Sequence, residues 1–217
     1  MVKVKICGLR RLQDIEIVNK YKPDFIGFVF AKSKRQVSLE EAKRLKQALS
    51  KEIKAVGVFV NEPLENIRRC ADEGVIDCVQ LHGDESKEEI EKLKRFVNVP
   101  IIKALRVESK CQIKRALQEL KEAPIDYYLF DTYHHNVYGG MGRSFDWKIL
   151  SELSELDEIQ KPYFLAGGIG CENIQVALKV KPFAIDLSSK VEVDGYKDET
   201  KIREIIQSII IRGEDDE

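Results

Sequence analysis

Short and almost wholly apolar runs recur along the chain, separated by stretches in which apolar residues have a helical spacing. One of these runs is FIGFVF at residues 25–30, which contains no charged residue. Continuous apolar runs of this kind are typical of parallel strands that helices cover. We predict eight strands, at residues 2–7, 25–30, 55–60, 78–81, 100–105, 127–131, 163–166 and 183–187.

The segments between these runs carry helix signals. Ser38 with Glu41, and Ser86 with Glu89, have the S-x-x-E spacing of a capping box. Pro63 suits the first turn of a helix. The last segment has one apolar stripe, made of the isoleucines at positions 202, 205, 206, 209 and 210.

Eight strand-helix units of about 27 residues fit a single-domain α/β fold, the (β/α)8 or TIM barrel. A doubly wound open sheet has fewer strands and places its phosphate loop after the first one. A chain of 217 residues with 43% hydrophobic content can bury one sizeable core. We therefore predict a barrel domain at residues 1–212 and a short acidic, disordered tail at 213–217.

The overall charge is balanced, since 36 Lys and Arg face 37 Asp and Glu. No global field favours nucleic acid or a membrane surface, whereas a small anionic metabolite held by a local patch remains compatible. The five cysteines are scattered without metal-ligand spacing, which indicates reduced thiols in a cytoplasmic protein. The N-terminus lacks the apolar core of a signal peptide, and no apolar run approaches the length of a membrane span.

Two turns near the end of the chain are suited to binding an anion. Gly167 and Gly168 follow the seventh predicted strand, and Ser188 and Ser189 follow the eighth. Glycine lets backbone amides approach a ligand closely, and serine adds hydroxyl donors. Because (β/α)8 barrels bind phosphate after strands 7 and 8, we predict a phosphate site here rather than two ordinary turns.

Cys7 and Asp131 end the first and sixth predicted strands, at the face where barrels carry their chemistry. One thiol and one carboxyl with no metal cluster suggest proton transfer between a base and an acid. The alternatives are that Cys7 is a small core residue, that Asp131 is a helix cap or turn residue, and that Cys7 and His82 form a covalent dyad. The dyad would need the first and fourth strand ends to meet, which a ring disfavours.

Other polar residues follow the strand ends. Arg35 lies in a basic loop that is either a solvated turn or a grip for a planar carboxylate, and His82 either contacts the ligand or satisfies backbone groups. The longest loop, from Asp131 to about position 147, has glycines at 139, 140 and 142 and is a candidate lid. It also contains histidines at 134 and 135, for which we predict no metal because a third ligand at suitable spacing is lacking.

The motifs together resemble the phosphoribosylanthranilate isomerase family of tryptophan biosynthesis, in order from residue 3 to about residue 206. The motifs are KICGL at 5–9, GFVF at 27–30 with SKR at 33–35, GVFVN at 57–61, VQLHG at 79–83, FD at 130–131, GGMGRSFDW at 139–147, LAGGI at 165–169 and DLSS at 186–189 with VE at 191–192. The resemblance implies a (β/α)8 enzyme, an aldose-ketose isomerase, that performs an Amadori rearrangement. The substrate would be N-(5-phosphoribosyl)anthranilate and the product 1-(o-carboxyphenylamino)-1-deoxyribulose 5-phosphate.

By this resemblance Cys7 matches the general base, Asp131 the general acid and Arg35 the residue that holds the anthranilate carboxylate. His82, Gly167, Gly168, Asp186, Ser188 and Ser189 would complete the substrate contacts. No cofactor is implied. The partner is a small phosphorylated molecule rather than nucleic acid or a membrane, and the protein would be a monomer or a homodimer.

The chain departs from the family pattern at Lys190, where glycine is expected, at Arg143 and Ser144 in place of Lys-Thr, and at Met141. If position 190 needs a positive φ, lysine there is strained, and its cation could lie near the phosphate. Two rival functions remain at this stage. They are another phosphate-binding barrel enzyme, such as a sugar-phosphate epimerase, and a barrel that binds its ligand without turnover.

Overall fold

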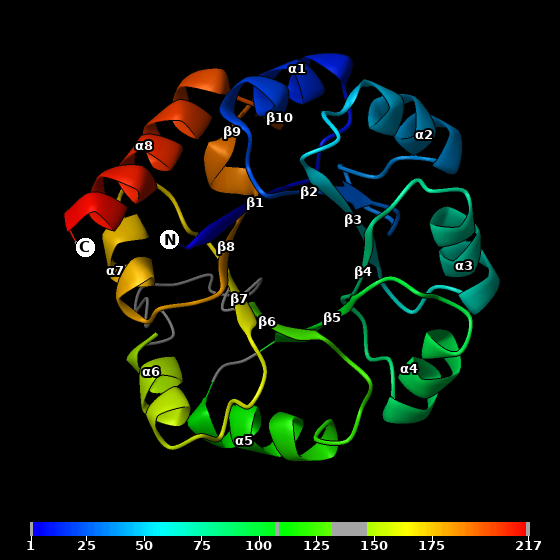
Figure 1. Ribbon diagram of the computed structural model, residues 1–217, viewed down its shortest axis with the longest axis vertical. Coiled ribbons are helices and arrows are strands. Elements are labelled where there is room, and N and C mark those ends of the chain that lie inside the picture. The colour runs from blue at the N-terminus through cyan, green and yellow to red at the C-terminus, as the bar shows by residue number, and fades with distance from the viewer. Residues whose placement is uncertain (1, 107–108, 132–146, 216–217) are drawn as a thin grey trace.

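Eight parallel strands close into a barrel in the computed structural model, which describes residues 2–106, 109–131 and 147–215. Neighbouring strands pair in chain order, and β8 pairs with β1 to close the ring (Figure 1). The strands are β1 (Lys3–Cys7), β2 (Phe25–Val29), β3 (Lys54–Phe59), β4 (Cys78–Leu81), β5 (Ile101–Arg106), β6 (Tyr127–Asp131), β7 (Tyr163–Ala166) and β8 (Ala184–Leu187). The predicted (β/α)8 fold and all eight strands are confirmed, with ends that differ by one residue at most.

In the described part of the chain, eight α-helices surround the ring (Figure 1). They are α1 (Leu12–Tyr21), α2 (Leu39–Ala48), α3 (Leu64–Asp72), α4 (Lys87–Lys94), α5 (Lys110–Glu119), α6 (Lys148–Glu155), α7 (Ile174–Lys179) and α8 (Glu199–Asp215). Between β8 and α8 lie a short 3-10 helix, η1 (Ser189–Val191), and a two-stranded ribbon made of β9 (Glu192–Val193) and β10 (Tyr196–Lys197). Within the described residues no helix is long and apolar enough to cross a membrane.

Local sequence signals set the helix ends. The side chains of Ser38 and Ser86 accept hydrogen bonds from the backbone of Glu41 and Glu89, so both predicted capping boxes are confirmed. Pro63 is the residue before α3 rather than part of its first turn. The helix α8 continues to Asp215, three residues into the predicted acidic tail, and the domain boundary at 212 stays a prediction.

The main core lies between the outer face of the barrel and the helices. Strand residues such as Ile6 and Ile26 pack there against helix residues such as Ile15 and Val18, all at most 1% exposed. The predicted stripe on α8 is buried at Ile202, Ile205, Ile206 and Ile209, while the side chain at position 210 lies outside the described part. This burial of one face of each helix holds the ring of strands in shape.

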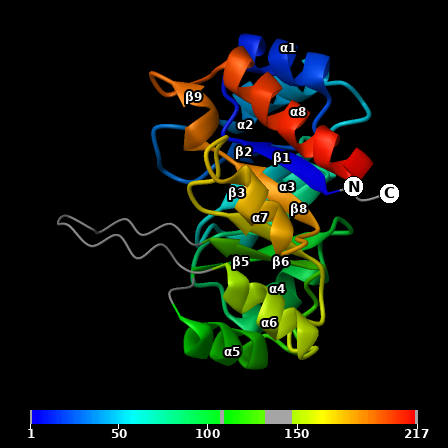
Figure 2. The same cartoon turned by 90° about the vertical axis from the view of Figure 1, so that its left-hand side faces the viewer.

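Aromatic side chains fill the barrel interior near the end at which the strands begin. The rings of Phe25 and Phe164 have centroids 5.4 Å apart, and those of Tyr127 and Phe183 are 4.9 Å apart. The ammonium of Lys3 lies 5.7 and 5.6 Å from the ring centroids of Phe25 and Phe183. The start of β1 and the end of α8 lie on one side of the molecule and β9 on the other (Figure 2).

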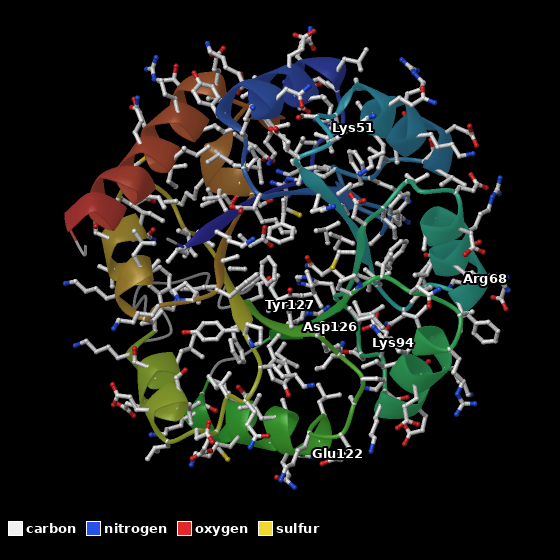
Figure 3. The ribbon with its side chains drawn as sticks, in the orientation of Figure 1. Lys51, Arg68, Lys94, Glu122, Asp126 and Tyr127 are labelled. Carbon is white, nitrogen blue, oxygen red and sulfur yellow. The ribbon has the colours of Figure 1, made fainter. Side chains whose placement is uncertain are left out.

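Three aspartates join neighbouring strands at this same end. Asp24, Asp77 and Asp126 directly precede β2, β4 and β6, and each accepts a hydrogen bond from the backbone at the start of the preceding strand. The donors are the N–H groups of Val4, Ala55 and Ile101, at 2.9, 2.7 and 2.8 Å. Asp126 also pairs with Lys94, with the ammonium 3.2 Å from the carboxylate (Figure 3). These contacts satisfy backbone donors that the sheet leaves unpaired.

Candidate active site

A cavity of about 480 Å³ opens at the carboxyl ends of the barrel strands. All nine predicted site residues line it, although they come from six different strand ends and the loops that follow them. They are Cys7, Arg35, His82, Asp131, Gly167, Gly168, Asp186, Ser188 and Ser189. The parallel barrel therefore gathers residues up to 182 positions apart into one site.

The thiol of Cys7 occupies space that a glycine on the next strand leaves open. Gly27 pairs with Cys7 across β1 and β2, and a Cβ at Gly27 would lie 2.7 Å from the sulfur. Gly8 follows Cys7 with φ of +87°, and its backbone N–H donates to the carbonyl of Gly27 at 2.9 Å. The turn at Gly8 therefore ends β1, while Gly27 makes room for the sulfur beside it.

Burial and a neighbouring lysine act on the thiol in opposite directions. Cys7 is only 8% exposed, and this burial raises the pKa of its thiol above the ordinary value. Lys5, two residues earlier on the same face of β1, favours the thiolate through its charge and a hydrogen bond, and Lys197 adds a smaller effect of the same sign. The structure thus contains positive charge that lowers the pKa of the thiol, but burial raises this pKa by more than the charge lowers it.

Lys5 and Asp186 form an ion pair inside the barrel. The ammonium of Lys5 lies 2.9 Å from Oδ2 of Asp186, and both side chains are buried. Burial raises the pKa of the Asp186 carboxyl, and the charge of Lys5 opposes this rise. Within the described residues, Oδ1 of Asp186 is buried without a hydrogen-bond partner. Because such an atom costs stability, its position in the cavity wall suits contact with a bound ligand.

Asp131 and His82 lie close enough to interact across the cavity. Nε2 of His82 is 3.3 Å from Oδ2 of Asp131, and Nδ1 of His82 is 2.8 Å from the amide nitrogen of Gln80. If Gln80 donates to Nδ1, the ring proton is on Nε2 and faces the carboxylate of Asp131. His82 therefore neighbours Asp131, while β1 and β4 are separated by two strands of the ring, which favours the acid-base arrangement over a Cys7 and His82 dyad.

Arg35 is not a solvated surface side chain. Its Nε and Nη2 each donate to one carboxylate oxygen of Glu192 at 2.7 Å, so the guanidinium and the carboxylate meet in a two-pronged contact. Although burial acts in the opposite direction on both groups, Arg35 together with Lys197 holds the pKa of Glu192 down at about 2, and Glu192 raises the pKa of Arg35. A Cβ at Gly8 would lie 2.5 Å from Cδ of Arg35, so this glycine also makes room for the arginine.

The two turns predicted to bind an anion differ in backbone, and glycine suits the first of them. Gly167 and Gly168 have φ of +98° and +66°, a region that favours glycine. The side chain of Asn173 donates to the carbonyl of Gly168 at 3.0 Å and so fixes this turn. Ser188 and Ser189 follow the neighbouring strand β8, at the start of η1, and line the same cavity.

Strain at Lys190 was expected only if its φ were positive, and this condition is not met. Lys190 lies in η1, and its φ is not among the positive values of the chain. Its ammonium lies 2.5 Å from Glu172, in the loop after β7, and the pair links the two turns after β7 and β8. The 3-10 turn avoids the left-handed backbone that would penalise a lysine, and the exposed carboxylate of Glu172 neutralises the cation.

Four residues of the site were not identified from the sequence, namely Lys5, Gln80, Glu192 and Lys197. Lys5 and Gln80 are buried strand residues two positions before Cys7 and His82, and this period-two spacing could have assigned them to the barrel interior. The candidate lid, with its glycines and histidines, and the departures at positions 141, 143 and 144 lie outside the described residues. Within the described part, no group of three metal-ligating side chains occurs.

The chain is similar to proteins of one enzyme family along almost its whole length. The family model described as N-(5'-phosphoribosyl)anthranilate (PRA) isomerase matches residues 4–208. An N-(5'-phosphoribosyl)anthranilate isomerase of Thermoanaerobacter pseudethanolicus is 46% identical over 210 residues, covering 96% of this chain and 98% of the relative.

Solved structures of the same family superpose on the chain. One is a phosphoribosyl anthranilate isomerase in complex with reduced 1-(o-carboxyphenylamino)-1-deoxyribulose 5-phosphate, with a TM-score of 0.79 and 35% identity over 95% of this chain and 97% of that one. Another contains monomers generated from the dimeric enzyme of Thermotoga maritima, with a TM-score of 0.78 and 36% identity over 95% and 97% of the two chains.

Proposed function

Since the chain belongs to the N-(5'-phosphoribosyl)anthranilate isomerase family, we propose that Cys7 and Asp131 are the base and the acid of its reaction. The enzyme converts N-(5'-phosphoribosyl)anthranilate to 1-(o-carboxyphenylamino)-1-deoxyribulose 5-phosphate in tryptophan biosynthesis. The observation that carries the assignment is the shared cavity, which Cys7 and Asp131 line together with the two anion-binding turns.

The two anionic groups of the substrate orient it in this cavity. The phosphate binds the backbone and hydroxyl donors at Gly167, Gly168, Ser188 and Ser189, and the carboxylate binds Arg35. The sugar then lies between these two ends, over Cys7, Asp131 and Asp186. The free oxygen of Asp186 accepts a hydrogen bond from a sugar hydroxyl, which supplies the partner that it lacks.

Asp131 starts the reaction by protonating the ring oxygen of the furanose. The bond between this oxygen and C1 breaks, and the nitrogen lone pair forms an iminium with C1. His82, directed by Gln80, donates to the resulting carboxylate of Asp131. The ring oxygen leaves poorly without this proton, which is why an acid is needed at this position.

Cys7 completes the rearrangement as its thiolate. The iminium makes the proton on C2 acidic, the sulfur removes it, and the electrons of the C–H bond reduce the iminium to the enolamine, which tautomerises to the ketone. Lys5 favours the thiolate through its charge. Burial raises the thiol pKa, so the thiolate is scarce and strongly basic when it forms.

The proposal extends to the setting of the enzyme. Residues 1–212 form the catalytic domain, and the enzyme works in the cytoplasm, where its free cysteines stay reduced. It is a monomer or a homodimer, and the dimeric relative from Thermotoga maritima supports the second. Light scattering at several protein concentrations distinguishes the two states.

A turnover assay tests the function. The substrate decays quickly, so it is generated in place, and loss of anthranilate fluorescence is followed with and without the enzyme. We expect loss well above the spontaneous rate, and its absence when the Cys7→Ser variant replaces the wild type. Turnover of a pentulose phosphate with none of the anthranilate substrate would indicate an epimerase, and binding without any turnover would indicate a ligand-binding barrel.

A further inference from the structure

A small hairpin between β8 and α8 contacts the site from outside the ring of eight strands. Its two strands, β9 and β10, pair antiparallel with Glu192 opposite Lys197. The connecting residues Asp194 and Gly195 have φ of +51° and +78°, which is the backbone of a two-residue hairpin turn. The turn therefore fixes the register that places Glu192 beside Lys197.

Contacts with the loop before α1 and with α8 hold this hairpin in place. Arg10 donates to the carbonyl of Gly195 at 3.1 Å, and the guanidinium carbons of Arg10 and Arg11 lie 4.3 and 3.9 Å from the ring centroid of Tyr196. Lys201 of α8 donates to the backbone carbonyl of Glu192 at 2.8 Å. The hairpin is therefore attached to the loop before α1 and to the first turns of α8.

The hairpin brings a buried carboxylate to Arg35. Both oxygens of Glu192 accept from Arg35 at 2.7 Å, and one of them also accepts from the ammonium of Lys197 at 2.7 Å. The side chains of Glu192 and Lys197 are 5% and 1% exposed. Burying charges in this way rarely stabilises a fold compared with an apolar core, so the cluster calls for a functional explanation.

Glu192 accepts hydrogen bonds from only one edge of the guanidinium of Arg35. An arginine carries five N–H groups, and Glu192 takes that of Nε and one of Nη2. The remaining groups on Nη1 and Nη2 form a second edge that can receive another carboxylate in the same two-pronged manner. With both cations protonated, the three side chains carry a net charge of about +1, which suits one anion.

Lys197 connects this cluster to the other anion site. Its ammonium also donates to the backbone carbonyl of Ser188 at 3.2 Å, in the turn that binds phosphate in the proposed function. We infer that Glu192 and Lys197 are positioning residues that hold Arg35 at a fixed place relative to the Ser188 turn. The inference rests on the proposed function, because it matches the spacing of the two anion sites to a substrate with a carboxylate at one end and a phosphate at the other.

Binding of two analogues tests the inference. One is reduced 1-(o-carboxyphenylamino)-1-deoxyribulose 5-phosphate, and the other is its phenylamino counterpart, which lacks the carboxylate. Calorimetry should show that Glu192→Gln loses at least about tenfold in affinity for the first analogue and less than about twofold for the second. The Michaelis constant should rise accordingly, while kcat changes far less. Glu199→Gln, on the exposed start of α8, is the matched control and should bind both analogues as the wild type does.

Further variants distinguish an error in the proposed role of Arg35 from an error in the positioning role of Glu192. Arg35→Met should abolish the preference for the carboxylated analogue, and adding Glu192→Gln to it should have no additional effect. If Arg35→Met keeps the preference, the proposed role of Arg35 is wrong. If Arg35→Met loses it but Glu192→Gln keeps it, only the positioning role is wrong, and equal weakening of both analogues in Glu192→Gln also contradicts that role. Should Glu192→Gln fold poorly, Glu192→Asp, whose carboxylate is one methylene shorter, should show a smaller loss confined to the carboxylated analogue.

Discussion

The two ends of the barrel interior contain different kinds of residues. Where the strands begin, aromatic rings fill the interior and aspartates satisfy the free backbone donors. Where the strands end, the interior holds Lys5, Cys7 and Asp186, which are ionisable and buried. The same eight strands thus stabilise the fold at one end and line the candidate active site at the other.

The two ends of the barrel differ most clearly in whether their polar atoms have hydrogen-bond partners. Each of the three aspartates at the first end meets a backbone donor. At the other end, and within the described residues, Oδ1 of Asp186 and Oε1 of Gln80 are buried without a partner. An unsatisfied buried polar atom costs about 1–3 kcal/mol, so the fold gives up stability where it binds a ligand. Changes at the two ends should therefore affect different measurements.

The largest expected effect is the loss of proton transfer at the strand ends. Cys7→Ser replaces an ionisable thiol with a hydroxyl that does not ionise in the usable range, and Asp131→Asn removes the transferable proton. Each change should lower kcat by at least about 10²-fold, with a smaller change in the Michaelis constant. Turnover and urea midpoints measured on the same variants should show that stability barely falls.

A core role for the thiol predicts the opposite pattern. Burying an unsatisfied hydroxyl at Cys7 would then cost about 1–3 kcal/mol, and residual activity would follow the folded fraction. A stable Cys7→Ser protein with near-normal kcat would overturn the base assignment and the mechanism with it.

The second effect is a dependence of stability on acid that arises at the active-site end. The pKa of Glu192 is about 2 in the folded protein, below the ordinary value of about 4.3. A carboxyl with a depressed folded pKa stabilises the fold above its unfolded pKa, and this contribution is lost as pH falls toward the folded value. The wild type should therefore exceed Glu192→Gln in stability by at most about 3 kcal/mol at pH 6.

The dependence of this stability difference on pH tests whether the carboxylate of Glu192 causes it. Urea titrations of wild type and Glu192→Gln between pH 6 and pH 3 should show a difference that is constant down to about pH 5 and then shrinks, because only the wild type can protonate this side chain. A difference that stays constant over the range would mean that the carboxylate is not linked to stability in this way.

The strand pattern predicted the fold well because it depends on local chemistry. Apolar runs and the S-x-x-E caps each act within a few residues, and each was confirmed, whereas the phosphate site at the glycine pair 167 and 168 stays a prediction. The nine site residues followed from their places at strand ends and from the family resemblance, and all of them line one cavity.

The contacts between distant side chains could not be predicted in this way. Arg35 and Glu192 are 157 positions apart, and no local pattern pairs them. The Asp194-Gly195 turn between Val193 and Tyr196 was a readable hairpin signal, and it would have placed Glu192 beside Lys197. Neighbouring residues in the chain set the pairing register of the hairpin. The contact of the hairpin with the loop before α1 depends instead on the closed barrel.

The third effect is a loss of stability at the end where the strands begin. Asp126→Ala removes the acceptor of the Ile101 N–H group and the partner of Lys94. The free energy of unfolding should fall by about 1–3 kcal/mol, while kcat of the folded enzyme stays unchanged. Asp126→Asn keeps an acceptor oxygen and should lose less. A fall in kcat that exceeds the loss of folded protein would show that the two ends are coupled.

The smallest expected effect is stabilisation by an anion at the glycine and serine turns. Sulfate binds only the native site, so at ten times its dissociation constant it adds about 1.4 kcal/mol, which raises the melting temperature by roughly 3–6 °C. Sulfate also stabilises proteins without specific binding, so matched sodium chloride alone is an incomplete control.

Two glycine variants provide a better control. Gly168 and Gly74 have φ of +66° and +67°, and a Cβ at Gly74 would meet nothing within 4 Å. Gly168→Ala and Gly74→Ala therefore introduce a similar backbone strain, but only the first lies in the anion site. Thermal scans should show that Gly74→Ala keeps the wild-type response to sulfate, whereas Gly168→Ala keeps only its nonspecific part. An equal response in both variants would mean that sulfate acts on the whole surface and that the turn after β7 is not an anion site.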